Sequence, residues 1–120
     1  LAIGLVWGLW HAPLIALGHN YPVHRAEGVV LFTLVCVLLS PLHALVREKG
    51  GSVWHAAVLH GTMNAGAGLS VMFLRGGDDL TAGAAGLGGV LGLLAVNALL
   101  LPWTLRLALR APDEAAPPGG

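Results

Sequence analysis

The chain of 120 residues is 56% hydrophobic and only 10% charged, and its six basic and six acidic side chains cancel at neutral pH. A soluble domain carries about a quarter charged residues, so this composition excludes an ordinary water-soluble protein. No basic cluster is present that could bind nucleic acid. The apolar stretches between the charges are long enough to cross ~30 Å of hydrocarbon. We therefore predict an all-α, polytopic transmembrane helical bundle with about four membrane helices.

Four apolar segments follow one another along the chain, separated by turn-forming or charged residues. They predict helices over about 1–18, 26–46, 53–74 and 83–109. These helices make up one predicted domain over residues 1–110. The polar, proline-rich tail 111–120 is expected to be disordered.

Local signals refine the limits of these helices. Pro41 interrupts the second segment, and we expect a kink there rather than a stop, because neighbouring groups in a membrane bundle can satisfy the freed carbonyl. Residues 47–51 are predicted to form a short loop, after which Ser52 is a suitable N-cap for the third helix. In the fourth segment, glycines recur every third residue, which predicts a packing ridge of Gly83, Gly86, Gly89 and Gly92.

Basic residues near the helix ends suggest an orientation. Four of them lie in the 47–51 loop and at the C-terminal end, against two in the other loops. The positive-inside rule therefore places the 47–51 loop and the C-terminus in the cytoplasm.

His60 and Asn64 are the strongest candidates for function. Both lie in the third apolar segment, one helical turn apart, so they share a face of the predicted helix. An ionisable side chain at membrane depth is costly and usually has a function there. The alternative is a buried hydrogen-bonded pair between helices, which membrane proteins also use.

His11 is the second candidate, in the first apolar segment. It follows Trp7 by one helical turn and precedes Pro13 by two residues. Taken alone, this pattern also fits simple packing of an aromatic ring against an imidazole.

We predict that the other four histidines are not ligands. His19 and His24 lie in or beside a loop and are expected to contact solvent or lipid headgroups. His43 lies near a predicted helix end, where a cation suits the helix dipole. His55 is five residues from His60 and falls on another helix face. The single cysteine, Cys36, lies in an apolar run and is interpreted as a small core residue.

A metal site is conceivable because imidazole is a good zinc ligand. However, the sequence has no His-Glu-x-x-His motif and no third strong ligand inside a predicted helix. Asp78 and Asp79 lie in a loop, and Glu27 and Glu48 lie near helix ends. No obvious general base is therefore available at membrane depth.

Two stretches resemble motifs of the CAAX protease and bacteriocin-processing (CPBP) family of intramembrane proteases. Residues 7–13, Trp-Gly-Leu-Trp-His-Ala-Pro, resemble the second motif, in which His follows an aromatic residue by four positions. Residues 51–65, with His60 and Asn64, resemble the third motif, His-x-x-x-Asn near a helix start. The resemblance covers about residues 1–74. Trp7 stands where the family more often has Phe.

The family's first motif, a Glu-Glu pair followed by Arg four residues after the second Glu, is absent from this sequence. In the family that motif lies upstream. A chain that starts with Leu1 rather than Met, inside an apolar segment, is therefore expected to be the C-terminal part of a protein that carries it.

The resemblance implies an intramembrane endopeptidase that hydrolyses peptide bonds in a membrane-embedded cavity. A glutamate of the first motif would activate water, His11 and His60 would polarise that water or bind a divalent metal such as Zn, and Asn64 would stabilise the oxyanion. The resemblance also implies a multi-pass protein of the bacterial plasma membrane, whose partners are lipids and a peptide or protein substrate. The 120 residues alone are expected to be inactive, and the substrate and oligomeric state stay open.

Two other functions remain as alternatives. The first is a non-catalytic membrane protein, such as a bacteriocin self-immunity or scaffold relative, that keeps the same residues for helix packing. The second is a small transporter subunit in which intramembrane histidines relay protons. That role needs an acidic partner at membrane depth, and the sequence shows none, so it ranks last.

Overall fold

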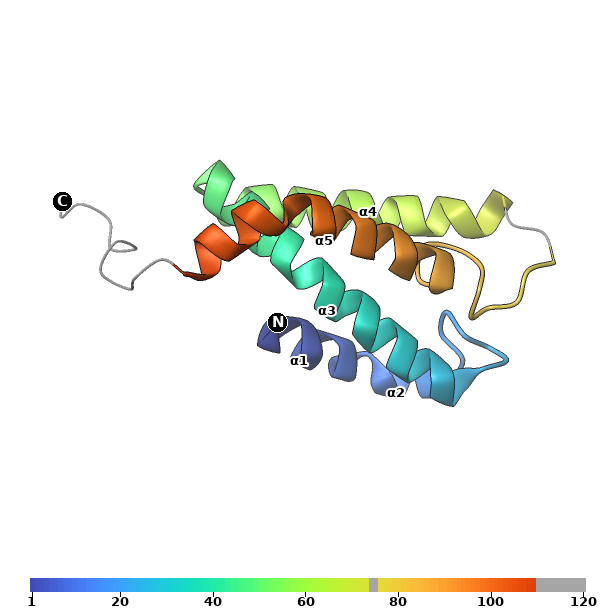
Figure 1. Ribbon diagram of the computed structural model, residues 1–120. Coiled ribbons are helices and arrows are strands. Elements are labelled where there is room, and N and C mark those ends of the chain that lie inside the picture. Colours follow the sequence, from blue (N-terminus) through green and yellow to red (C-terminus); the bar gives the residue numbers. More distant parts are fainter. Residues whose placement is uncertain (74–75, 110–120) are drawn as a thin grey trace.

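The computed structural model describes residues 1–73 and 76–109, and of residues 70–72 only the backbone; residues 74–75 and 110–120, including the predicted tail, lie outside this description. Within these ranges the regular structure is all helical (Figure 1). The helices are α1 (Ala2–Trp10), α2 (Ala12–Ala16), α3 (Arg25–Gly50), α4 (Val53–Phe73) and α5 (Leu87–Ala108).

Helix α3 is the centre of the arrangement, because α1, α2, α4 and α5 each pack against it. In Figure 1 it runs diagonally between the α1–α2 pair and the α4–α5 pair. A small core forms where Val35 and Leu39 of α3 meet Val90 of α5, with Trp7 of α1 and Met63 of α4 packed against them. One helix thus holds the two motif-bearing helices, α1 and α4, in place.

Helix α3 continues through Pro41, which confirms that this proline does not stop the helix. A proline has no N–H, so the carbonyl four residues earlier, that of Val37, loses its helical donor. The hydroxyl of Ser40 donates to that oxygen at 2.9 Å. The amide of Asn97 on α5 donates to the next carbonyl, that of Leu38, at 2.8 Å. Side chains therefore donate hydrogen bonds to the carbonyls beside the proline, as is usual in membrane helices.

Two glycines let α1 approach the backbone of α3. A Cβ atom on Gly4 would lie 2.6 Å from the carbonyl oxygen of Cys36, and one on Gly8 would lie 2.5 Å from the Cα of Thr33. Both glycines are buried. Small residues four apart are a common contact in lipid, where close backbone packing replaces the hydrophobic effect.

Tyr21, in the loop before α3, forms a hydrogen bond with the segment before α5. Its side chain is fully buried, and its hydroxyl donates to the carbonyl of Ala85 at 2.5 Å. Gly28 leaves room for the tyrosine ring, which a Cβ atom there would overlap. Burial raises the pKa of Tyr21 to about 12. These two connecting segments therefore lie at the same end of the bundle.

Helix α3 is one turn longer than predicted, and the expected 47–51 loop shrinks to Gly51 and Ser52. Arg47 and Lys49 lie in the last turn of α3, where cations interact favourably with the helix dipole. The helix ends only at Gly51, whose φ of 68° is the left-handed cap that glycine adopts readily. The hydroxyl of Ser52 accepts from the N–H of Trp54 at 3.3 Å, which confirms Ser52 as the N-cap of α4.

Helix α5 begins at Leu87, four residues later than predicted. Gly83 has a φ of 77° and Gly86 is the extended N-cap residue, so both precede the helix. The predicted four-glycine ridge is therefore wrong, because left-handed and extended glycines suit the connecting segment and not a helix face.

Two helices are long and apolar enough to cross a membrane, α3 and α5. The apolar stretch Ala2–Ala16, which comprises α1 and α2, is shorter. Helix α4 carries two histidines and Asn64 and does not meet the same criterion among the described residues. The all-α prediction is confirmed, and two of the four predicted spans are supported by length and hydropathy.

Candidate active site

Trp7 lies at the centre of a group of rings drawn from three helical regions. Its ring centroid lies 5.2 Å from that of His60 on α4, 5.6 Å from that of His43 on α3 and 6.3 Å from that of His11. In the described part of the chain, no ring contact joins His11 and His60 directly. The two sequence motifs therefore meet through the indole of Trp7.

His11 occupies the single-residue break between α1 and α2. Pro13 follows at the start of α2 and cannot donate to the preceding turn, which favours the break. The Nδ1 of His11 lies 2.8 Å from the carbonyl oxygen of Trp7, so in this contact Nδ1 carries the proton and donates. In the neutral imidazole, Nε2 then keeps its lone pair and can accept a proton or a hydrogen bond.

His60 and Asn64 lie on one face of α4, as predicted from their spacing. The amide Nδ2 of Asn64 donates to the Nε2 of His60 at 3.1 Å. His60 is half-buried, whereas Asn64 is exposed. In this arrangement the amide holds the imidazole, and it would have to turn away for Nε2 to take another partner.

A cavity of about 710 Å³ opens beside these rings, between α1, α3, α4 and α5. Trp7, His43 and His60 line it together with Asn97, and most of the remaining wall is apolar. Pockets of this size, apolar with a few polar groups, typically hold small ligands or peptide segments. His11 and Asn64 are not among the lining residues, so the predicted site residues do not all face one space.

His43 lies beside His60, a position that the sequence did not predict. Its ring centroid lies 5.9 Å from that of His60, and it lines the same cavity. We placed it near a helix end because the second helix was predicted to stop at residue 46, but α3 continues to Gly50. Because α3 continues to Gly50, His43 lies well inside a membrane helix. An ionisable side chain at that depth is costly, which is the same signal that marked His11 and His60.

The described residues around Trp7 do not form a group of three metal-ligating atoms. Within the described ranges, the one such group is His24, Asp78 and Asp79, whose ligand atoms lie within 4.8 Å of one another. The imidazoles near Trp7 meet as pairs of rings, and the Nε2 of His60 is engaged by Asn64. The predicted metal role of His11 and His60 stays a prediction.

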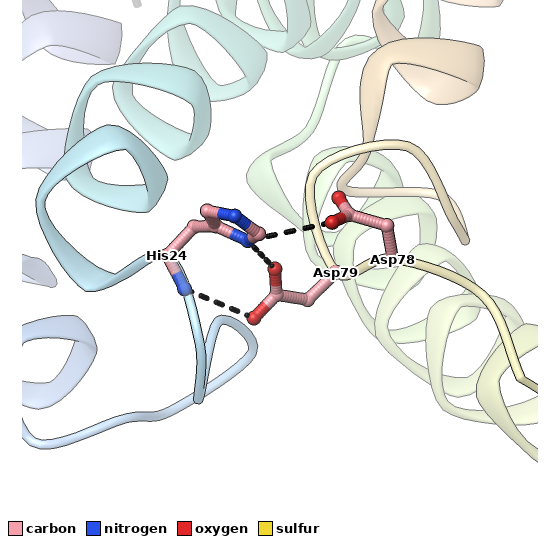
Figure 2. Close-up of side chains that lie close together, drawn as sticks. All are labelled: His24, Asp78 and Asp79. Atoms are coloured by element: carbon pink, nitrogen blue, oxygen red, sulfur yellow. Dashed lines mark hydrogen bonds and ion pairs between the residues drawn. The ribbon is translucent and has the colours of Figure 1, made fainter.

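The cluster of His24, Asp78 and Asp79 joins the two loops at one end of the bundle (Figure 2). The Nδ1 of His24 lies 2.5 Å from one oxygen of Asp79 and 3.6 Å from a carboxylate oxygen of Asp78. The other oxygen of Asp79 accepts from the N–H groups of Val23 and His24, at 2.7 and 3.3 Å, where α3 begins. His24 was expected to contact solvent or headgroups; its ring is instead engaged by the aspartates, because the carboxylate of Asp79 binds both the backbone just before α3 and the imidazole.

The contacts within this cluster shift the pKa values of His24 and Asp79. The hydrogen bond to Asp79 raises the pKa of His24 above its ordinary value of 6.5, with the charge of Asp78 adding to the effect. Partial burial pushes the pKa of Asp79 upward, but the hydrogen bonds from His24 and Val23 outweigh it, and the pKa falls below 3.8. Both shifts favour the charged forms, so the contact is stabilised as an ion pair when His24 is protonated.

This ion pair makes the thermal stability of the protein depend on pH. Because the pKa of His24 is raised, its contribution is complete below pH 6.5 and is lost as pH rises through the raised value. Because the pKa of Asp79 is lowered, its contribution is present above 3.8 and is lost as pH falls through the lowered value. Asp79→Asn should lower the melting temperature most between these limits and return the pKa of His24 toward 6.5, which a histidine NMR titration measures.

Asp78→Asn is the matched control, since Asp78 lies further from His24 and does not bind the backbone just before α3. It should change the melting temperature less than Asp79→Asn at every pH. Equal effects of the two variants would contradict the assigned ion pair.

Comparison with known proteins bears on the N-terminal half of the chain. Residues 1–66, more than half of the 120, match the model of the family described as "Type II CAAX prenyl endopeptidase Rce1-like". No curated protein and no solved structure matches the chain significantly. The matched residues include Trp7, His11, His60 and Asn64.

Proposed function

This chain belongs to the Rce1-like type II CAAX prenyl endopeptidase family, and we propose that it is an intramembrane endopeptidase that hydrolyses peptide bonds in a membrane-embedded cavity. The residues assigned to the reaction are His11, His60 and Asn64. The observation that carries the proposal is the contact of His11 and His60 with the same indole, Trp7. It supports one shared site for two motifs that lie on separate helices.

The tautomer of His11 and the amide of Asn64 both suit hydrolysis. The Nε2 of His11 has a free lone pair, so it can accept a hydrogen bond from a water molecule and make that water more nucleophilic. Asn64 offers an amide N–H that can turn from His60 to the oxyanion of the tetrahedral intermediate. In an apolar site such a donor stabilises the transition state strongly, because the local dielectric constant is low.

The chain has no Glu-Glu pair with the family's arginine spacing, so no residue in it is assigned the role of general base. The reaction steps attributed to these 120 residues are orientation of the water, stabilisation of the oxyanion and binding of the peptide. The wall of the cavity is apolar enough to accept a hydrophobic peptide, and the indole of Trp7 forms part of that wall.

We further propose that the protein is multi-pass and lies in the bacterial plasma membrane, with α1–α2 and α4 as membrane helices beside α3 and α5. Twenty-five large apolar side chains of the described residues are exposed, whereas only seven hydrophobic side chains, Cys36 included, are buried. A soluble monomer rarely exposes so large an apolar surface, whereas lipid would cover it. The contacts between the loops before α3 and before α5 also fit a bundle that crosses repeatedly and returns its loops to one side.

A non-catalytic packing role is the second candidate, and one observation favours it. Each polar group of the two motifs has a partner within its own helical segment, His11 with the Trp7 carbonyl and His60 with Asn64. If these residues only pack helices, exchanging His60 and Asn64 together for an apolar pair of similar size would leave function intact. The endopeptidase proposal requires that this exchange abolish cleavage.

His11→Ala is the direct test of the proposed function. We expect a loss of ~10²-fold or more in cleavage rate, because the variant removes the imidazole that orients the water. The protein, expressed from its complete gene and reconstituted in lipid nanodiscs, is assayed with a farnesylated peptide that ends in the C-a-a-X sequence and with an unprenylated hydrophobic peptide. His19→Ala, in an exposed loop, is the control and should cleave at the wild-type rate.

Wild-type cleavage that persists in His11→Ala would overturn the assigned role of His11. Absence of cleavage of both peptides by the wild-type protein would count against the endopeptidase proposal and for the packing alternative.

A further inference from the structure

In the proposed site His60, like His11, helps to orient the water by accepting a hydrogen bond at Nε2, and this requires its single proton to be on Nδ1. Its Nε2 accepts the amide hydrogen of Asn64, and a neutral imidazole carries one proton, so Nδ1 is then the protonated nitrogen. Only in this tautomer can Nε2 accept a hydrogen bond from water when Asn64 turns toward the oxyanion. Something has to hold that tautomer.

Asn64 cannot hold it by itself. A side-chain amide has a donor end and an acceptor end, so a rotation of about 180° lets it accept from an Nε2–H as readily as it donates to a bare Nε2. Both tautomers of His60 would then be satisfied by the same asparagine. The group on the other side of the ring decides which tautomer persists.

His43 has the chemistry for that role. Its Nδ1 lies 3.0 Å from the carbonyl oxygen of Leu39 and can only donate there. The Nε2 of neutral His43 is therefore an acceptor, and it is buried without a hydrogen-bond partner among the described residues. A buried acceptor with no donor is unfavourable, so a donor within reach should be bound.

We propose that His43 is a positioning residue of the active site, which accepts a hydrogen bond at Nε2 from the Nδ1–H of His60. The two ring centroids lie 5.9 Å apart with the ring planes inclined at 60°. A ring nitrogen lies ~1.1 Å from its centroid, so a hydrogen bond of ~3 Å between two imidazole nitrogens places the centroids at most ~5.2 Å apart. The two rings must therefore rotate and approach each other by ~0.7 Å to close the contact. This inference rests on the proposed function of His60.

The result is one directional series of hydrogen bonds. His60 donates to His43, and His43 donates to the carbonyl of Leu39, so each ring has a single permitted tautomer. When Asn64 turns away and the Nε2 of His60 accepts a hydrogen bond from water instead, the Nδ1–H of His60 still donates to His43, so the ring keeps its tautomer and orientation. His43 thus acts through His60 and needs no contact with the substrate.

The test combines His43→Phe and His43→Leu, which remove the acceptor, with His43→Gln, whose side-chain carbonyl restores one. Nitrogen NMR shifts of labelled histidine rings, recorded at neutral pH on the nanodisc-reconstituted protein, report the tautomer of His60. That signal is assigned by its loss in His60→Ala. The wild-type protein should show the Nδ1–H form, and the Phe and Leu variants should shift His60 toward the Nε2–H form.

The kinetic readout should follow the spectroscopic one. We expect kcat to fall by ~10–100-fold in the Phe and Leu variants with KM little changed, as for other residues that orient a catalytic histidine. His43→Gln should recover the wild-type tautomer and most of kcat. His19→Phe, a histidine in an exposed loop, should change neither readout.

An unchanged His60 tautomer in both His43→Phe and His43→Leu would overturn the inference, and so would a failure of His43→Gln to rescue either readout. If one apolar variant does not fold, the other decides. If the tautomer shifts as expected but the wild-type protein cleaves no peptide, the contact between His43 and His60 stands and the proposed function falls.

Discussion

His60→Ala is expected to lower kcat/KM for peptide cleavage by ~10³-fold or more while the protein still inserts and folds. The imidazole of His60 is the one group that touches Asn64, Trp7 and the cavity at once. Its loss removes a hydrogen-bond acceptor for the water and also releases the amide of Asn64 from its position. It costs little in stability, because His60 is only half-buried and reaches the core around Val35 only through its contact with Trp7.

His55→Ala is the matched control for this variant. His55 lies on the same helix, is exposed, and has its ring against Gly50 rather than in the cavity. Cleavage is measured for both variants in nanodiscs, with circular dichroism as the check of helix content. Equal losses in the two variants would mean that α4 responds to any change and that His60 has no special role.

Gly8→Leu should have the largest effect on the fold. A Cβ atom at this position would lie 2.5 Å from the Cα of Thr33 and 2.9 Å from its Cβ, and the first of these belongs to backbone that cannot yield. We expect the free energy of unfolding to fall by about 3 kcal/mol, the upper end for overpacking a close contact. Because Trp7 is the preceding residue, the same displacement of α1 should separate Trp7 from His60 and reduce cleavage by ~10²-fold.

Gly92→Leu is the control for added volume. Nothing lies within 4 Å of a Cβ atom at Gly92 on α5, so the leucine meets open space. Thermal unfolding in nanodiscs, followed by tryptophan fluorescence, compares the two variants. If Gly8→Leu unfolds no more easily than Gly92→Leu, the close packing of α1 on α3 is not important for stability.

Local signals predicted the parts of the site that lie within one helix. His60 and Asn64 share a face because four residues make about one helical turn. Ser52 caps α4, and α3 passes through Pro41, for reasons that involve residues close in sequence. The same reasoning failed for residues 47–51, because basic residues that suggested a loop stabilise the last turn of α3 instead.

Local sequence signals could not predict the contacts between segments that are distant along the chain. The ion pair between His24 and Asp79 and the hydrogen bond from Asn97 to Leu38 join residues far apart in the sequence. The close approach of α1 to α3 depends on Gly8 facing Thr33, which neither helix shows alone. These contacts arise from the way four helical segments share one central helix.

The sequence by itself determined that the chain is helical and apolar, and which residues form the two motifs, because composition and spacing are properties of neighbours along the chain. Only the tertiary structure decided that Trp7 joins His11 to His60 and that His43 belongs beside them. The physical reason is that α1 and α4 come together only by packing on α3, and the packing of α4 on α3 brings His60 beside His43.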